Sequence, residues 1–168
     1  MMDVHESIKT CMVARAFRSD PVPPAVITKI LEAARLCQSQ RNRQAWHFIV
    51  IEDRAMLGQL GALASSGPFL ADAPLAIAVA MEVPKFAQVD AGRAIQSMTL
   101  AAWAEGVANC YVGSFDTNQV KSLLGIPATM ELISVLPFGY PGKMPRGKRR
   151  KPLREIAHRG RFGTPFEG

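Results

Sequence analysis

The sequence predicts an α/β or α+β fold in which helices cover a sheet. Stretches with apolar residues at helical spacing alternate with short apolar runs that are typical of buried strands. This alternation of helix and strand occurs four times along the chain, as expected when helices pack on a sheet. The chain has 168 residues, of which 48% are hydrophobic, so we expect one domain, residues 1–168, with a packed core.

The first half of the chain contains two helical and two strand patterns. A helix is expected over residues 21–37, because Pro23 and Pro24 suit a first turn and apolar residues then recur at helical spacing. A strand is expected at residues 47–52, followed by a helix over 54–64. Residues 75–81 form a second buried run, for which the alanines leave a helix as the alternative.

The second half repeats this order. The longest helical pattern runs from Gln88 to Glu105 and ends at Gly106, a favourable residue after a helix. Residues 107–113 predict a third strand. Asp116 can cap a short helix that continues to Leu124, and residues 132–139 predict the last strand.

Several classes of protein are excluded by what the sequence lacks. The three cysteines form no CxxC pair, and the three histidines lack ligand spacing, so neither a disulfide framework nor a metal site is expected. No G-x-G-x-x-G or G-x-S-x-G motif occurs. The N-terminus has no apolar signal region and no stretch is long enough to span a membrane, so we expect a cytoplasmic protein with no membrane partner.

The net charge of +6 is concentrated near the C-terminus. Residues 143–161 contain nine Lys or Arg and one acid, Glu155. Such a cluster often indicates a solvated or phosphate-binding surface, and a nucleic-acid binder is the alternative. The segment has no aromatic residue on which a base could stack, so a nucleic-acid partner is not expected.

A polar segment between the first helix and the first strand is the most informative part of the chain. Residues 39–46 read Ser-Gln-Arg-Asn-Arg-Gln-Ala-Trp. The hydroxyl of Ser39 and the amides of Asn42 and Gln44 can donate to and accept from the polar edge of a heterocycle. The alternative is a loop whose polar side chains only satisfy its own backbone.

Three further motifs accompany this segment in order. They are Arg15-Ala16-Phe17-Arg18, Gly139-Tyr140-Pro141 and the basic run Lys148-Arg149-Arg150-Lys151-Pro152-Leu153-Arg154-Glu155. Together the four motifs resemble the nitroreductase family, in which R-R-S-x-R is followed by S-x-x-N-x-Q-P-W, G-Y-P and K-x-R-K-P-L-x-E. The resemblance extends from Arg15 to Ile156, nearly the whole chain.

The resemblance implies a nitroreductase-like α+β fold with a central, mainly antiparallel sheet flanked by helices, and a homodimer. It implies an oxidoreductase that binds FMN, takes hydride from NADH or NADPH, and reduces a small-molecule acceptor such as a nitroaromatic or a quinone. No side chain is then expected to be catalytic, because FMN carries the chemistry. The implied cofactor-binding residues are Arg15, Ala16, Arg18, Ser39, Asn42, Gln44, Gly113, Ser114, Lys148 and Arg150.

The resemblance also implies a role for each part of this set. Lys148 and Arg150 hold the phosphate, and Arg15 contacts the flavin or its phosphate. Ser39, Asn42 and Gln44 face the isoalloxazine and the ribityl chain. Backbone amides near Gly113 and Ser114 approach the N5 and O4 edge of the flavin.

The chain departs from the family pattern at three positions. Ala14 and Ala16 replace the first Arg and the Ser of R-R-S, and Ala45 replaces the Pro before Trp46. One phosphate charge and one hydroxyl are therefore missing, so a lower affinity for FMN is expected. A flavin-binding carrier or sensor with little turnover is the alternative function.

The helix expected at residues 88–105 supports a dimer. Its second half, Met98–Ala104, is apolar or small on nearly every face. A helix with this composition must be covered on all sides, which predicts a partner subunit. The alternative is a central helix buried within a monomer.

Overall fold

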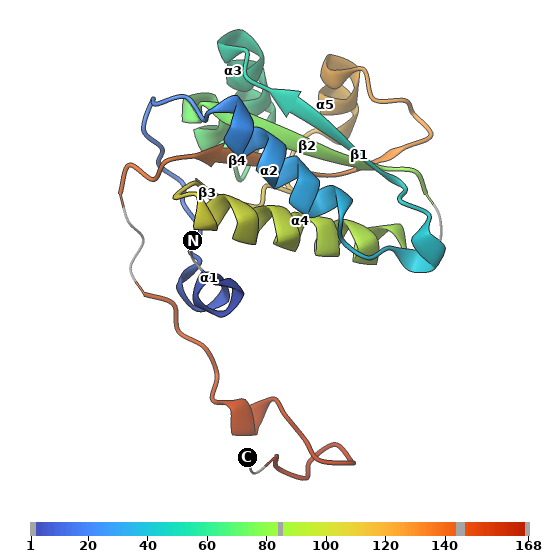
Figure 1. The fold of residues 1–168 in the computed structure, drawn as a ribbon. Helices are drawn as coiled ribbons and strands as arrows, with labels where there is room; N and C mark the ends of the chain where they lie inside the picture. The colour runs from blue at the N-terminus through green and yellow to red at the C-terminus, as the bar shows by residue number, and fades with distance from the viewer. Residues whose placement is uncertain (1–2, 84–85, 144–146, 167–168) are drawn as a thin grey trace.

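The structure is a computed structural model that describes residues 3–83, 86–143 and 147–166. Within these ranges an antiparallel sheet of four strands lies at the centre, with helices on both of its faces (Figure 1). This architecture confirms the expected α+β fold. In order across the sheet, the strands are β1 (Trp46–Ile51), β2 (Leu75–Met81), β4 (Glu131–Gly139) and β3 (Ala108–Asn109).

Strand β2 lies between β1 and β4, and all seven of its residues are buried. Successive side chains of a strand point to opposite faces, so its larger residues share one face and its alanines share the other. The larger residues pack with helices α2 (Pro24–Arg35) and α4 (Ala87–Ala104), and the alanines pack with α3 (Arg54–Leu63). The strand prediction is therefore confirmed, because an alternation of large and small residues serves two differently packed faces.

The second face of the sheet is covered by α3, the short 3₁₀ helix η2 (Pro68–Asp72) and α5 (Thr117–Leu124). Two of these helices begin at an aspartate, as helix capping predicts. The Asp53 carboxylate accepts from the backbone N–H of Met56 at 2.8 Å, and the Asp116 carboxylate accepts from that of Gln119 at 3.0 Å. The expected helices at 54–64 and 116–124 are thus confirmed to within a residue or two.

The third strand is much shorter than expected. Residues 107–113 predict a strand, but β3 contains only Ala108 and Asn109. Beyond Asn109 the chain leaves the edge of β4 and returns at Val112, whose carbonyl oxygen accepts from the N–H of Val135 at 3.0 Å and from the hydroxyl of Ser134 at 2.9 Å. The Val112 carbonyl thus accepts both a backbone and a side-chain bond from β4, but no regular ladder connects it to β3.

Helix α1 (Val4–Thr10) precedes all of the elements that the apolar pattern predicts. The Asp3 carboxylate caps it by accepting from the N–H of Glu6 at 2.9 Å. An Asp followed three residues later by a Glu is a helix-start signal, although the short helix has no strong apolar stripe to accompany it.

Helix α4 is the longest of the described helices, and α1 packs against it. Residues 98–104 of α4 are all buried or partly buried, and the indole N–H of Trp103 donates to the hydroxyl of Thr10 at 2.9 Å. The chain itself therefore supplies part of the cover for which the sequence suggests a partner subunit. No helix among residues 3–83, 86–143 and 147–166 combines the length and apolar character needed to cross a membrane.

The C-terminal segment, residues 147–166, extends away from the sheet and helices (Figure 1). It contains the short turn η3 (Leu153–Glu155) and includes most of the basic cluster; Arg146 of that cluster lies outside the described residues. Three of its apolar side chains are well exposed. These are Leu153 at 62%, Ile156 at 60% and Phe162 at 93% of full exposure.

Candidate functional site

The motif near the N-terminus runs between β3 and the end of β4. The N–H of Ala14 donates to the carbonyl of Asn109 at 3.0 Å, and the N–H of Arg18 donates to the carbonyl of Tyr140 at 2.9 Å. The N–H of Gly142 donates to the carbonyl of Ala16, also at 2.9 Å. The segments 15–18 and 139–141, which are far apart in the sequence, therefore lie side by side.

Arg15 and Arg18 have different surroundings within this motif. Arg15 is exposed and has no ion-pair or hydrogen-bond partner for its side chain among the residues described. The Nε of Arg18 donates to Asp20 at 2.7 Å, and its guanidinium carbon lies 5.2 Å from the centre of the Tyr140 ring. The hydrogen bond from Arg18 lowers the pKa of Asp20. Arg15 is thus available to an anionic ligand, whereas Arg18 is already paired.

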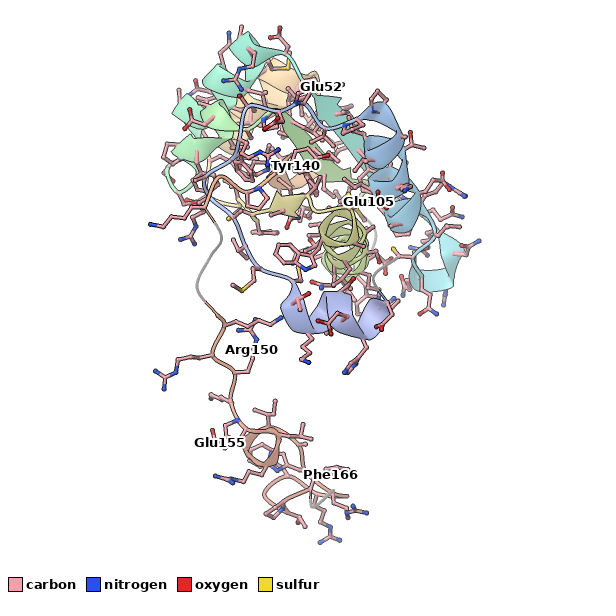
Figure 2. All side chains as sticks on the ribbon, turned by 60° about the vertical axis from the view of Figure 1, so that its left-hand side comes forward. Glu52, Glu105, Tyr140, Arg150, Glu155 and Phe166 are labelled. Atoms are coloured by element: carbon pink, nitrogen blue, oxygen red, sulfur yellow. The ribbon has the colours of Figure 1, made fainter. Side chains whose placement is uncertain are left out.

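Lys148 is bonded to the chain just before Arg15, at the end of α1. Its Nζ donates to the carbonyl of Ile8 at 2.7 Å and to that of Cys11 at 3.2 Å, at the C-terminal end of α1. Burial raises the pKa of Cys11, and the positive charge of Lys148 opposes that shift. Figure 2 shows Arg150 where the C-terminal segment has just left the body of the protein, with its side chain exposed.

The segment from Ser39 to Gln44 forms a tight polar loop around the 3₁₀ helix η1 (Gln40–Asn42). Arg41, Asn42 and Gln44 have left-handed φ angles of 52°, 54° and 52°. A non-glycine residue in this region costs roughly 1–2 kcal/mol, and such residues are concentrated at functional sites.

Some polar side chains of this loop bond to the loop itself, and one does not. The N–H of Gln44 donates to the Ser39 hydroxyl at 3.1 Å, and the Gln44 side-chain amide donates to the Asn42 carbonyl at 3.3 Å. Ser39 and Gln44 therefore serve the loop's own backbone, as the structural alternative expects. The Asn42 side chain is exposed and makes no hydrogen bond with any described residue, so it is free to meet a ligand.

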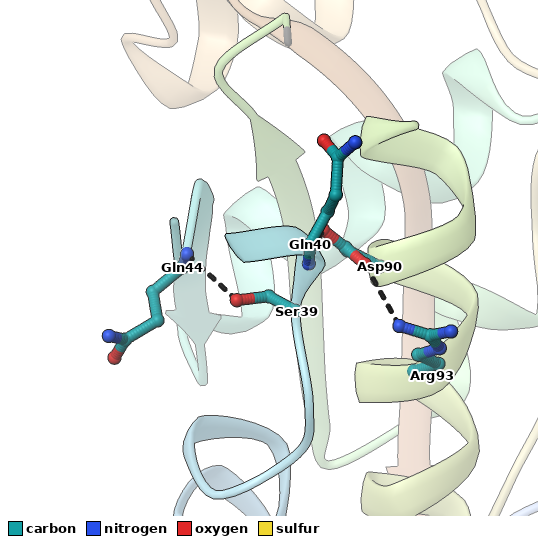
Figure 3. Close-up of polar contacts among 5 residues, drawn as sticks. All are labelled: Ser39, Gln40, Gln44, Asp90 and Arg93. Carbon is teal, nitrogen blue, oxygen red and sulfur yellow. Dashed lines mark hydrogen bonds and ion pairs between the residues drawn. The ribbon is translucent and has the colours of Figure 1, made fainter. Parts of the chain in front are cut away.

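A buried aspartate on α4 holds this loop. The Asp90 side chain accepts from the N–H of Gln40 at 2.9 Å, and its other oxygen lies 3.4 Å from a guanidinium nitrogen of Arg93 (Figure 3). The side-chain oxygen of Gln40 is buried with no hydrogen-bond partner among the described residues. Asp90 is not among the site residues expected from the sequence motifs. The feature of the sequence that could have identified it is its position on the apolar face of the helix, between Ala87 and Ala91, which are both buried.

The structure does not bring the expected site residues together in one place, and two groups of them lie toward opposite ends of α4. Asp90, in the first turns of α4, contacts the loop of residues 39–44. Near the other end of α4, Thr99 accepts from the Asn109 side chain at 2.9 Å, and Asn109 is paired with Ala14. From Asp90 to the last turn of the helix at Trp103 is about 20 Å. Within one chain, the loop of residues 39–44 therefore lies at one end of α4, and the segment of residues 14–18 lies toward the other end (Figure 1). Lys148 is bonded to the end of α1, which meets α4 at Trp103.

Gly113 and Ser114 form a third part of the expected site. The Ser114 hydroxyl lies 2.8 Å from that of Ser65, which anchors this segment to the loop after α3. A Cβ atom at Gly113 would lie 2.7 Å from the Tyr111 ring, so the ring position requires glycine here. Both residues are exposed, and their backbone N–H groups donate to no described residue. These two donors are free to approach a ligand.

An open groove of about 660 Å³ runs along the outer surface of α4. It begins at residues 36–38, directly before Ser39, and continues along α4 as far as Leu100. Cys37 lies in it, and its pKa is raised by burial and by the charge of Asp90, while Arg93 acts in the opposite direction. The described residues contain no group of three or more His, Cys, Asp or Glu that could hold a metal ion.

Comparison with known proteins identifies the family. The model of the Nitroreductase family matches residues 9–82 and 61–140. A protein of Methanothermobacter thermautotrophicus, described as an NADH dehydrogenase/NAD(P)H nitroreductase, is 34% identical over 153 residues, which is 86% of this chain and 80% of that protein.

Solved structures share the fold. One from Parabacteroides distasonis, described in the same words, aligns with a TM-score of 0.88 at 24% identity and covers 95% of this chain and 99% of that one. An FMN-dependent nitroreductase from Clostridium difficile aligns with a TM-score of 0.87 at 22% identity, covering 93% and 98% of the two chains. The sequence match, the ordered motifs and the helix-flanked antiparallel sheet lead to one conclusion: the chain belongs to the nitroreductase family.

Proposed function

We propose that the protein binds FMN and uses NADH or NADPH to reduce nitroaromatic, quinone or related acceptors. Membership of the nitroreductase family supports an oxidoreductase, and one structure with the same fold is named as FMN-dependent. The observation that carries the proposal of FMN is the exposed guanidinium of Arg15, which has no partner among the described residues and follows closely in the chain on the end of α1, to which Lys148 is bonded. A flavin mononucleotide needs such cations for its phosphate dianion.

The donors in this structure fit the parts of FMN. Arg15, Lys148 and Arg150 provide positive charge for the phosphate. The backbone N–H groups of Gly113 and Ser114 are available to the N5 and O4 edge, where donors stabilise the negative charge of the reduced ring. When bound, FMN supplies the acceptance of hydride and the release of electrons, so that the protein binds, orients and tunes it.

We further propose that two copies of the chain, each a single domain, form a homodimer and complete each flavin site together. Residues Ser39 to Gln44 and the Arg15–Lys148 group lie at opposite ends of α4, so one chain does not bring them to the same flavin. A second copy related by a two-fold axis can bring the loop of one copy to the cations of the other. The open groove along α4 offers a surface for such a contact.

The C-terminal segment supports the same assembly. It extends from the body with Leu153, Ile156 and Phe162 exposed to solvent. Apolar side chains in such a projecting segment are normally covered, and a second copy would bury them.

The absorption spectrum of the purified protein tests the proposal directly. Flavin absorption, followed by heat release and chromatography that identifies FMN, is the expected result. Released FAD, or no bound and no bindable flavin, would contradict it. Turnover of NADH or NADPH with menadione then separates an enzyme from a flavin carrier or sensor. That alternative is supported by Ala14 and Ala16, which lack the charge and the hydroxyl of the family pattern, and by the pairing of Arg18 with Asp20.

A further inference from the structure

We infer that Asp90 is a positioning residue that holds the loop Ser39–Gln44 in the conformation that presents Asn42 to the flavin. The inference rests on the proposed function, because it assigns Asp90 a role at the same site. Asp90 is only 3% exposed, and its carboxylate accepts from the N–H of Gln40 at 2.9 Å (Figure 3).

The location of this carboxylate indicates a specific task. It lies in the apolar stripe of α4, near Ala87, Ala91 and Ala94, all of which are buried. A charged group in such a place is unfavourable unless hydrogen bonds compensate for the lost water. One carboxylate oxygen accepts from the loop amide and the other accepts from Arg93, so each oxygen has a hydrogen-bond partner among the described residues.

Capping of its own helix does not explain Asp90. The residue at the N-cap of α4 is Phe86, which has no polar side-chain atom, and Asp90 lies one turn inside the helix. The hydrogen bond of Asp90 to a backbone amide goes across to the loop rather than to the first turn of α4. By contrast, Asp53 and Asp116 cap the helices that they begin.

The loop depends on this bond. Three of its residues have left-handed backbone angles, and its other hydrogen bonds join one loop residue to another. Among the residues described, the bond from Gln40 to Asp90 is the one hydrogen bond that joins residues 39–44 to a different element. Loss of the Asp90 acceptor therefore removes the one described hydrogen bond that joins the loop to another element.

Arg93 provides a natural comparison. Its side chain is half exposed and lies 3.4 Å from Asp90, so it makes a weaker contact than the loop amide does. Removal of Arg93 leaves the bond to Gln40 in place. Asp53→Ala is a second control, because it deletes a carboxylate bond to a backbone amide of similar length far from the loop.

The test compares Asp90→Ala, Asp90→Asn, Arg93→Ala and Asp53→Ala with the unaltered protein. Dissociation constants for FMN are measured by quenching of flavin fluorescence, and the environment of the bound ring by visible circular dichroism. Hydrogen exchange at the Gln40 amide is measured without flavin, which reports on the loop independently of binding.

Asp90→Ala is expected to weaken FMN binding at least about tenfold, since a hydrogen bond to a charged acceptor is lost. It should also remove the protection of the Gln40 amide and change the visible dichroism. Asp90→Asn should recover much of the affinity, because the amide oxygen still accepts from Gln40. Asp53→Ala should stay within about twofold of the unaltered protein, since it leaves the loop anchor untouched. Arg93→Ala should keep the protection of the Gln40 amide, since the bond from Gln40 to Asp90 stays in place.

The outcomes separate the two proposals. If the unaltered protein binds FMN and both Asp90 variants bind it equally well, the inference about Asp90 is wrong while the proposed function stands. If Asp90→Ala fails to fold, the exchange of the Gln40 amide in the unaltered protein decides the question, and rapid exchange of this amide would overturn the inference. If the unaltered protein binds no flavin, the proposed function is wrong and the role of Asp90 at a flavin site is wrong with it.

Discussion

The Nζ of Lys148 donates to the carbonyl oxygen of Ile8 at 2.7 Å, which ties the start of the basic C-terminal segment to the end of α1. This contact joins residues 140 positions apart and fixes the side of the molecule on which the segment begins. Two residues further on, Arg150 is exposed, and among the described residues its guanidinium donates only to the neighbouring carbonyl of Arg149.

Arg150→Ala should therefore weaken FMN binding more than Arg149→Ala. In an extended segment, alternate side chains share one side, so Arg150 and Lys148 are expected to face the phosphate and Arg149 to face away. The loss of a charged hydrogen bond should cost roughly 1.5–3 kcal/mol, or about tenfold or more in dissociation constant. Fluorescence titration measures both variants, and equal constants would show that the phosphate is held elsewhere.

Asn42→Gly should lower the affinity for FMN without lowering stability. Asn42 is exposed at a φ of 54°, so glycine removes the amide and relieves about 1 kcal/mol of backbone strain. The expected loss is about two- to tenfold in dissociation constant, the range for a neutral hydrogen bond. Arg41→Gly is the matched control, since Arg41 has a similar φ of 52° and no assigned contact with the flavin. If both variants retain full affinity, the loop is purely structural.

Alkylation of Cys37 should report the charge of Asp90. Burial raises the pKa of this thiol, Asp90 raises it further, and Arg93 lowers it. Asp90→Asn removes a negative neighbour, so the pKa should fall and the reactive thiolate should become more abundant at a given pH. Arg93→Ala removes a positive neighbour, so alkylation should become slower.

Peptide-resolved mass spectrometry after a series of iodoacetamide exposures at pH 7 to about 9 measures these rates, because a thiol titrates in this range. Cys11 serves as the internal control, since its pKa is influenced by burial and Lys148 rather than by Asp90. Changes of the same sign in both variants would show that altered access, not charge, controls the rate.

The elements were predictable from the sequence where their ends depend on neighbouring residues. Asp53 and Asp116 begin helices through bonds to amides three residues away, and Gly125 ends one with a left-handed φ of 66°. The length of β3 was not predictable, because it depends on where the chain separates from β4. Helix α1 has a local capping signal at Asp3 but too short an apolar pattern to be identified by spacing.

The candidate site was predictable as a set of residues but not as an arrangement. Motif order identified Asn42 and Arg15, yet their separation along α4 depends on contacts of Asp90 and Asn109 that span long stretches of sequence. The role of Asp90 was also hidden, since an isolated acid in a helix is usually read as a solvated residue. The left-handed angles at Arg41 and Gln44 could not be anticipated, because neither residue type favours that region.

If the flavin site is shared between two chains, two defective variants should restore binding in a mixed dimer. Arg15→Ala should damage the phosphate half of a site, and Asn42→Gly should damage the loop half. If each site takes its halves from different copies, a mixed dimer of the two variants contains one site with both defects and one site with neither. Light scattering of the unaltered protein at micromolar concentration should first show a dimer.

The variants are then unfolded together, refolded and titrated with FMN. Random pairing makes half of the dimers mixed, so about a quarter of the sites should regain the original affinity. Each variant refolded alone is the control and should regain none. If the site lies within one chain, every site in the mixture carries one defect and no high-affinity fraction can appear. A monomer that binds FMN fully would contradict both the dimer and the shared site.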